Sequence, residues 1–123
     1  MIKNTIIGIS FLAATILSSA LCAGDAEDAV VADPEHYSVE FENDRVRIIR
    51  IKYGPGEKSV MHTHGPHVVV LLTENELRMT LPDGTSEEST TQAGAAQWSD
   101  AGVHLPENLS DQAMEVILVE LKQ

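Results

Sequence analysis

The sequence predicts an all-β protein that folds as one closed β-barrel or jelly roll. From position 36 to the C-terminus, short apolar or alternating segments are separated by turns rich in Gly, Pro, Asn and Asp. No window keeps the period of an amphipathic helix over three turns. A chain of 123 residues also has room for only one modest hydrophobic core. About eight short strands in a single small domain are typical of a barrel or jelly roll.

The expected strands follow one another at short intervals. Their ranges, in chain order, are 37–42, 45–53, 59–64, 67–73, 76–81, 86–91, 96–99 and 114–121. In the second range the apolar positions change phase between Ile48 and Ile49, which predicts a β-bulge there. The fourth range is apolar enough for burial on both faces. The tetrapeptide PDGT at 82–85 predicts a hairpin between the fifth and sixth strands.

Residues 1–23 have the layout of a secretory signal peptide. Lys3 precedes an apolar run that ends at Leu21, and small residues follow, so we expect cleavage after Ala23. A retained membrane anchor is the weaker alternative, because the run barely reaches spanning length. A lipid anchor on Cys22 is a further alternative, although Leu21 stands where lipoprotein processing prefers a small residue. We therefore expect a periplasmic or secreted protein with no stable membrane insertion after cleavage.

The rest of the chain divides into two parts. Residues 24–35 are small, acidic and interrupted by Pro34, which predicts a flexible acidic lead-in that is not an element of the fold. Residues 36–123 carry the strand pattern and form the expected barrel domain.

The charge balance restricts the partners of this protein. Eight basic residues stand against 19 acidic ones, a formal net charge of −11. Such a surface repels nucleic acid and anionic membranes, so we exclude nucleic acid as a partner. Cleavage would remove Lys3 and Cys22 and take the net charge from −11 to −12. The exported protein would then have no thiol, so its chemistry has to come from histidines, carboxylates, hydroxyls or a bound ion.

Histidines provide the main functional signal. Four of the five fall in two short segments, His62, His64 and His67 in the first and His104 in the second. On a strand, His62 and His64 project from the same face and form half of a metal site, which His104 on another strand would complete. The alternative without a metal is a polar surface alternation at His62 and His64, with His67 as a core histidine bonded to a backbone carbonyl.

The histidine segments also contain two longer spaced motifs. In the first, Gly56 is followed by five residues, His62, one residue and His64. The second motif is carried by Gly94, Gly102, His104 and Asn108. In this order the two motifs resemble those of the cupin superfamily, over roughly 37–122. The resemblance implies a single-domain cupin barrel, also called a double-stranded β-helix, with a divalent metal ion at the histidines. Cupins often pair through barrel edges, which implies a homodimer.

Two positions depart from the cupin motifs. Asp100 stands where the second motif usually has Pro, and Val68 and Val69 occupy the positions expected for the Glu ligand of the first motif. Two ligand sets therefore remain open: His62, His64 and His104 alone, or these three with His67 in the place of Glu. We favour the second slightly. Neutral imidazoles leave the full charge of a divalent ion uncompensated, so either set should favour an anionic ligand.

The resemblance leads to three functional hypotheses. The first is an exported, metal-dependent enzyme of dioxygenase type that acts on a small anionic organic molecule. Its cofactor would be a divalent transition-metal ion, with iron favoured over manganese, nickel, zinc and copper. The alternative is a non-catalytic module that binds a metal or small ligand, and the third hypothesis is a barrel without a metal. The sequence leaves the choice between enzyme and binding module open.

Other residues allow weaker inferences. The aromatic residues Tyr53, Phe41 and Trp98 are expected mainly in the core, because the chain has few aromatics to fill a barrel. Arg78 is a candidate for a substrate carboxylate, although arginines on strands are usually solvated. Asn108 opens a glycosylation sequon, which has meaning only in a glycosylating host.

Overall fold

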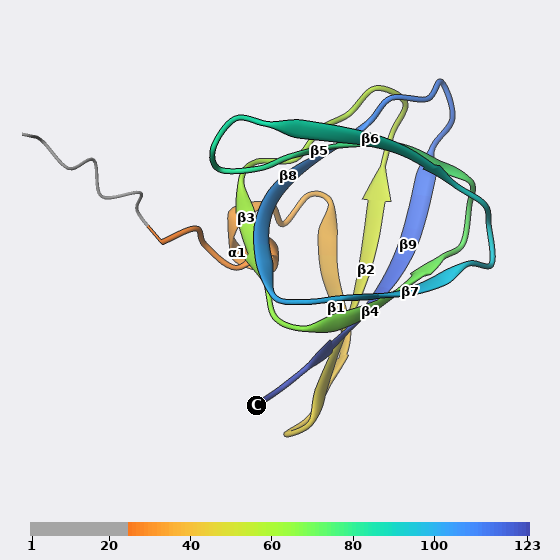
Figure 1. The fold of residues 1–123 in the computed structure, drawn as a ribbon. Coiled ribbons are helices and arrows are strands. Elements are labelled where there is room, and N and C mark those ends of the chain that lie inside the picture. The colour runs from red at the N-terminus through yellow and green to blue at the C-terminus, as the bar shows by residue number, and fades with distance from the viewer. Residues whose placement is uncertain (1–24) are drawn as a thin grey trace, which may run out of the picture.

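The computed structural model describes residues 25–123, and these residues form two antiparallel sheets that curve around a common interior (Figure 1). The elements are α1 (Ala29–Ala32), β1 (Tyr37–Glu42), β2 (Val46–Tyr53), β3 (His62–His64), β4 (His67–Leu71), β5 (Asn75–Thr80), β6 (Ser86–Thr91), β7 (Ala96–Ser99), β8 (Gly102–Asn108) and β9 (Met114–Leu121). The all-β prediction is confirmed. The predicted leader, including Cys22, lies outside the described residues.

The two sheets interleave strands from distant parts of the chain. The five-stranded sheet has the order β1-β2-β9-β4-β7, and the four-stranded sheet has the order β3-β8-β5-β6. The hairpin predicted at 82–85 joins β5 and β6, and Gly84 supplies its positive φ of 86°. Between residues 25 and 123, no helix is long and apolar enough to cross a membrane.

The predicted β-bulge exists, but its extra residue lies on the neighbouring strand. Val39 pairs with Ile49 and Phe41 pairs with Ile48, so Glu40 of β1 is the inserted residue. Strand β2 itself keeps a regular register with β9. The phase change in the sequence has another cause: Ile48 faces the outer surface, whereas Ile49 is fully buried on the inner one.

The core lies between the sheets and depends mostly on β2 and β9. Inward positions of these two strands place Ile49, Ile51, Val116 and Leu118 in one buried cluster. Each such side chain contributes about 1.5–3 kcal/mol on full burial. Strict alternation along β9 keeps every second residue in this core, which is why its range is predicted correctly from the sequence.

Two of the three aromatic residues expected in the core lie on the outer face instead. Trp98 is 55% exposed and Phe41 is 50% exposed. The strand register places them at opposite ends of an apolar row, in which Ile48, Val119 and Val68 lie between them. The expectation was therefore wrong for Phe41 and Trp98. On β4 only His67 and Leu71 are buried and the three valines between them are half-buried, so the expected burial on both faces is not observed.

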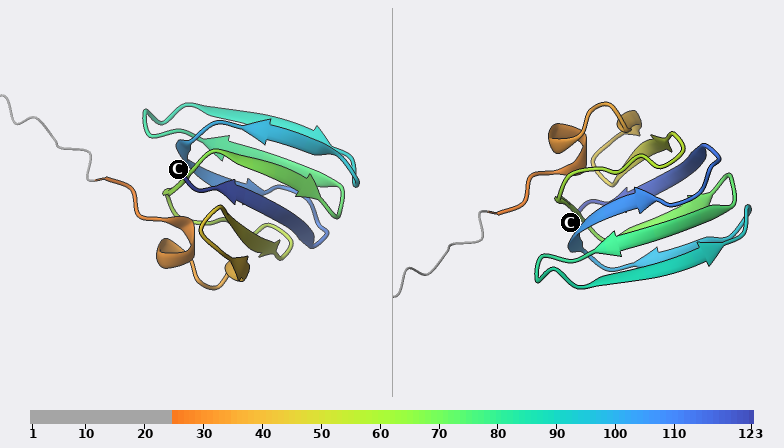
Figure 2. Two further views of the ribbon diagram at one scale, coloured as in Figure 1. Left: turned by 90° about the horizontal axis from the view of Figure 1, so that it is seen from below. Right: turned by 90° about the horizontal axis from the view of Figure 1, so that it is seen from above.

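The acidic segment before the barrel is part of the fold, contrary to our expectation for 24–35. Helix α1 is a single turn whose N-cap is Asp28, and Ala29 is completely buried in the core cluster. The Thr63 amide of β3 donates to the Glu27 carbonyl, so this segment is bonded to the strand that carries His62. Figure 2 shows α1 on the outside of the barrel wall. A helix of one turn has no sequence period, which is why the pattern did not predict it.

The asparagine of the glycosylation sequon is also structural. Asn108 has no exposed surface, and its amide donates to the carbonyls of Gly54 and Gln112. The folded protein therefore does not present this side chain for glycosylation.

His36 fastens the N-terminal segment to the barrel. Its Nδ1 lies 2.8 Å from Asp33 and its Nε2 lies 3.0 Å from Glu57, while the ring stacks on Tyr53 at 4.6 Å. Burial lowers the pKa of His36, but the hydrogen bonds to Asp33 and Glu57 outweigh burial and hold the pKa above its ordinary value. Protonated His36 therefore bridges two carboxylates.

This bridge predicts a pH dependence of stability. Because the folded-state pKa of His36 is raised, its contribution is fully present below the unfolded pKa and is lost as pH rises through the folded pKa. At about pH 5.5, His36→Asn should lower the free energy of unfolding by about 1 kcal/mol relative to wild type. At about pH 9 this difference should become smaller, because the charge-dependent part is lost while the stacking on Tyr53 remains. Urea unfolding of both proteins measures it, and a difference independent of pH would contradict the bridge.

Candidate metal centre

Strand pairing brings three histidines together. His62 and His64 lie on the inward face of β3, and His62 is paired directly with His104 of β8. The ring centroids are 4.9 Å apart for His62 and His64, 5.0 Å for His62 and His104, and 5.4 Å for His64 and His104. One ligand nitrogen of each lies within 4.8 Å of the others. The predicted grouping of these three residues is therefore present.

Hydrogen bonds orient two of these imidazoles through Nδ1. His62 Nδ1 lies 2.8 Å from the Val60 carbonyl, and His64 Nδ1 lies 2.8 Å from Glu120 Oε1. A carbonyl or carboxylate oxygen accepts, so Nδ1 donates and Nε2 carries the free lone pair. His62 Nε2 is buried without any hydrogen-bond partner. A buried polar atom without a partner is costly, and a metal ion in this group would satisfy it.

His67 lies beside this group. Its Nδ1 donates to the Gly65 carbonyl at 2.7 Å, and its ring lies 5.3 Å from that of His64. It is not among the three residues whose ligand atoms lie within 4.8 Å of one another. A role for His67 as a fourth ligand stays a prediction.

Three histidines of the site, His62, His67 and His104, have lowered pKa values, which favours the neutral form that metal binding requires. Burial, followed by the charges of the neighbouring imidazoles, lowers the pKa of His104 to about 3. Burial followed by the charge of His64 lowers the pKa of His62 to about 4. The pKa of His67 is also lowered, mainly by burial. Neutral imidazoles offer lone pairs over the whole physiological range.

A buried carboxylate supports His64 from the opposite side. Glu120, the last inward residue of β9, is only 5% exposed and accepts hydrogen bonds from His64 and Arg47. Burial alone would raise the pKa of Glu120, but these two hydrogen bonds outweigh it and lower the pKa. Arg47 also forms an ion pair with Asp28. A carboxylate that accepts from a ligand imidazole fixes the ring and raises its basicity.

Sequence reasoning missed Glu120. One signal was available in the sequence. Every second residue of β9 faces inward, and this series of Met114, Val116, Leu118 and Glu120 ends in a charged side chain at a buried position. A charged residue in such a series needs a partner. Its partner His64 is 56 residues earlier, and only strand pairing brings the two together.

A second support comes from the N-terminal segment. Buried Asp33 accepts a hydrogen bond from Ser59 Oγ at 2.6 Å, and Ser59 Oγ lies 3.2 Å from His62 Nδ1. The segment after α1 is thus connected to His62 through the side chain of Ser59. Asp100, by contrast, accepts from the Trp98 indole and takes no part in the site.

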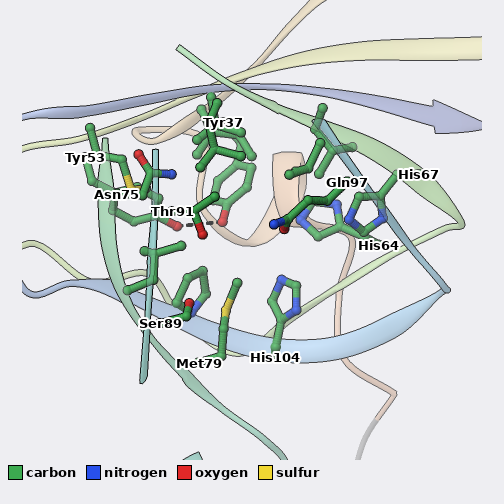
Figure 3. A pocket seen from close by; sticks show the side chains of 18 residues that line it. Tyr37, Tyr53, His64, His67, Asn75, Met79, Ser89, Thr91, Gln97 and His104 are labelled. Atoms are coloured by element: carbon green, nitrogen blue, oxygen red, sulfur yellow. Dashed lines mark hydrogen bonds between the residues drawn. The ribbon is translucent and has the colours of Figure 1, made fainter. Parts of the chain in front are cut away.

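The imidazoles open onto a cavity of about 270 Å³ between the two sheets. Figure 3 shows His64 and His67 on one side of it, with Asn75, Thr91 and Ser89 on the other. His104 also lines it, whereas His62 is fully buried. The arrangement can hold a metal ion at the wall of a small chamber.

Comparisons with known proteins agree with this architecture. A cupin domain from Bordetella pertussis Tohama I is 28% identical, with a TM-score of 0.66, over 71% of this chain and 92% of that chain. An RmlC-like cupin family protein with a double-stranded β-helix fold from Methanocaldococcus jannaschii is 21% identical, with a TM-score of 0.54, over 73% and 84%. A cupin superfamily protein from Desulfitobacterium hafniense DCB-2 is 15% identical, with a TM-score of 0.54, over 71% and 76%.

The Methanocaldococcus and Desulfitobacterium proteins are only 21% and 15% identical to this chain, so their similarity shows the fold alone. No protein-family model matches the chain, and no curated protein matches it.

The contact between Glu120 and His64 predicts an effect on metal affinity. Glu120→Gln keeps the size of the side chain but removes the charge that holds the His64 imidazole. Affinity for a divalent transition metal should fall about 10- to 100-fold, measured by competition with a chromophoric chelator. The matched control is Glu115→Gln on the outer face of the same strand, which should leave affinity unchanged. Equal affinities for both variants would show that Glu120 does not position His64.

Proposed function

We propose that this chain, a single-domain member of the cupin superfamily, holds a divalent transition-metal ion at His62, His64 and His104. We further propose that it is a metal-dependent enzyme of dioxygenase type that acts on a small anionic organic molecule. The observation that supports this most directly is the convergence of three imidazoles, one with a buried Nε2 that has no hydrogen-bond partner, at the wall of a cavity.

The donor set suits iron, manganese, nickel, zinc or copper, all of which accept imidazole nitrogen. We favour iron, which would supply the reaction with dioxygen. The protein's own groups prepare the site: Glu120 and the Val60 carbonyl orient two of the rings, and burial lowers the pKa of His62 to about 4. The apolar cavity wall limits the access of water.

The absence of a carboxylate from the ligand group supports an anionic substrate. The group of described residues close enough to share an ion contains only histidines. Three neutral ligands leave the full positive charge of the ion to attract an anion. Glu120 is nearby, but it is turned toward His64 Nδ1 and neutralised by Arg47.

A non-catalytic metal-binding module is the second candidate, and the position of His67 favours it. In a four-coordinate site, such as one for zinc, a fourth imidazole close to His64 would fill the last coordination position and leave none for a substrate. Occupancy of the site alone therefore does not identify an enzyme.

Export is part of the proposal and is supported by the signal-like residues 1–23. It requires that the protein recovered from the periplasm begins at Gly24, which N-terminal sequencing reads directly.

Single histidine variants test the metal site. The parent should carry close to one equivalent of transition metal by elemental analysis, and His62→Ala and His104→Ala should each abolish it. Thr90→Ala, on the outer face of β6 and outside the cavity lining, is the control and should retain the metal. Retention in His67→Ala would assign three ligands, and loss would assign four. A parent without metal would overturn the proposed function.

Nitric oxide separates the enzyme from the binding module. It is a stable surrogate for dioxygen and binds ferrous sites that have an open position. The iron-loaded parent should give the electron paramagnetic resonance signal of a high-spin iron nitrosyl. A loaded site that remains silent is closed, which would contradict the enzyme and support the binding module.

A further inference from the structure

The cavity beyond the histidines carries no charge. Among the 18 described residues that line it, none is Lys, Arg, Asp or Glu. We propose, on the basis of the function proposed above, that the substrate carries one negative charge at the end that meets the imidazoles. The rest of the substrate is an uncharged, largely apolar body that fills the cavity.

The arginines that could bind a second anionic group of the substrate are already paired with carboxylates. Arg78, considered from the sequence for a substrate carboxylate, forms ion pairs with Glu88 and Glu107 and does not line the cavity. Arg47 likewise forms ion pairs with Asp28 and Glu120. A second carboxylate or a phosphate on the substrate would enter the cavity without a counter-charge, and burying an unpaired charge is costly.

The walls favour an apolar body. Leu77, Met79 and Pro106 line the cavity from the smaller sheet, and Val69 and Leu71 line it from the larger sheet. Removing apolar groups from water against such walls contributes about 25 cal/mol per Å².

The polar groups of the lining are neutral. The hydroxyls of Tyr37 and Tyr53 bond to each other at 2.5 Å, and burial raises the pKa of Tyr53 to about 12, so both phenols stay protonated. Ser89 and Thr91 add hydroxyl groups from β6. These groups can bond to a hydroxyl or carbonyl group of the substrate, but they do not compensate a charge.

The volume limits the size of the molecule. At about 270 Å³ the cavity lies just below the roughly 300–1,000 Å³ typical of sites for drug-sized ligands. The exposed lining residues Ser89 and Gln97 lie on β6 and β7, which are edge strands of the two sheets. The substrate therefore enters between these edges and is smaller than a nucleotide.

A matched pair of carboxylates tests the proposal. Hexanoate and adipate have the same number of carbon atoms, but adipate has a second carboxylate at the far end. Each is titrated into the cobalt-loaded full protein, and binding is followed by the visible absorption of cobalt. Azide, which needs only an open position, is titrated in parallel. Hexanoate should bind about tenfold or more tightly than adipate, because only adipate buries an unpaired charge.

A new charge at the far end of the cavity should abolish this preference. Ser89 is exposed on edge strand β6 and lines the cavity away from His64 and His67 (Figure 3), so Ser89→Lys should fold. In this variant the affinity for adipate should rise about tenfold relative to the affinity for hexanoate, because the second carboxylate of adipate gains a counter-charge. The control Thr90→Lys adds the same charge one residue along the strand, on its outer face, and should retain the parent's preference.

The outcomes separate the two proposals. If azide changes the cobalt spectrum and adipate binds the parent as tightly as hexanoate, the substrate class is overturned and the metal site stands. An unchanged preference in Ser89→Lys would likewise overturn the substrate class, because the ligand body would then lie outside the cavity. A protein that binds no cobalt, or whose cobalt does not respond to azide, would overturn the proposed enzyme and this inference with it.

Discussion

The hydrogen bond between Glu120 and His64 is the interaction on which the site and the N-terminal segment both depend. It places a carboxylate inside an apolar barrel, where an unpaired charge would be strongly destabilising. Arg47 compensates that charge and is itself held by Asp28, the N-cap of α1. One chain of contacts therefore runs from the helix, through two ion pairs, to a candidate metal ligand.

A strongly acidic surface and an uncharged cavity coexist in this protein. The acidic side chains near the cavity are paired with arginines or turned outward, as Glu88 and Glu107 are toward Arg78. Inside, neutral imidazoles and protonated phenols leave a bound cation as the one proposed source of positive charge. The barrel thus combines repulsion of anions at its surface with attraction at one interior point, which would favour small molecules with a single charge.

Much of the site could be predicted because it follows local spacing. Residues i and i+2 of a strand share a face, so His62 and His64 had to point together once their segment was extended. His104 could be assigned only through its motif, and strand pairing places it directly opposite His62. Glu120, Asp33 and α1 could not be assigned, because each acts through a partner distant in sequence and no short-range period marks such a partner.

The sequence by itself determined the all-β class, most of the strand ranges and the shared face of His62 and His64, since alternation and turn residues act over a few neighbouring positions. Only the tertiary structure decided which face of the large sheet is exposed, where Glu120 finds its partner and that the cavity is uncharged. Trp98 is exposed because of its register with Val68, and Arg78 is paired on the outer face with Glu88 and Glu107, which strand pairing places beside it. Registers between distant strands set these features, and local sequence patterns do not contain that information.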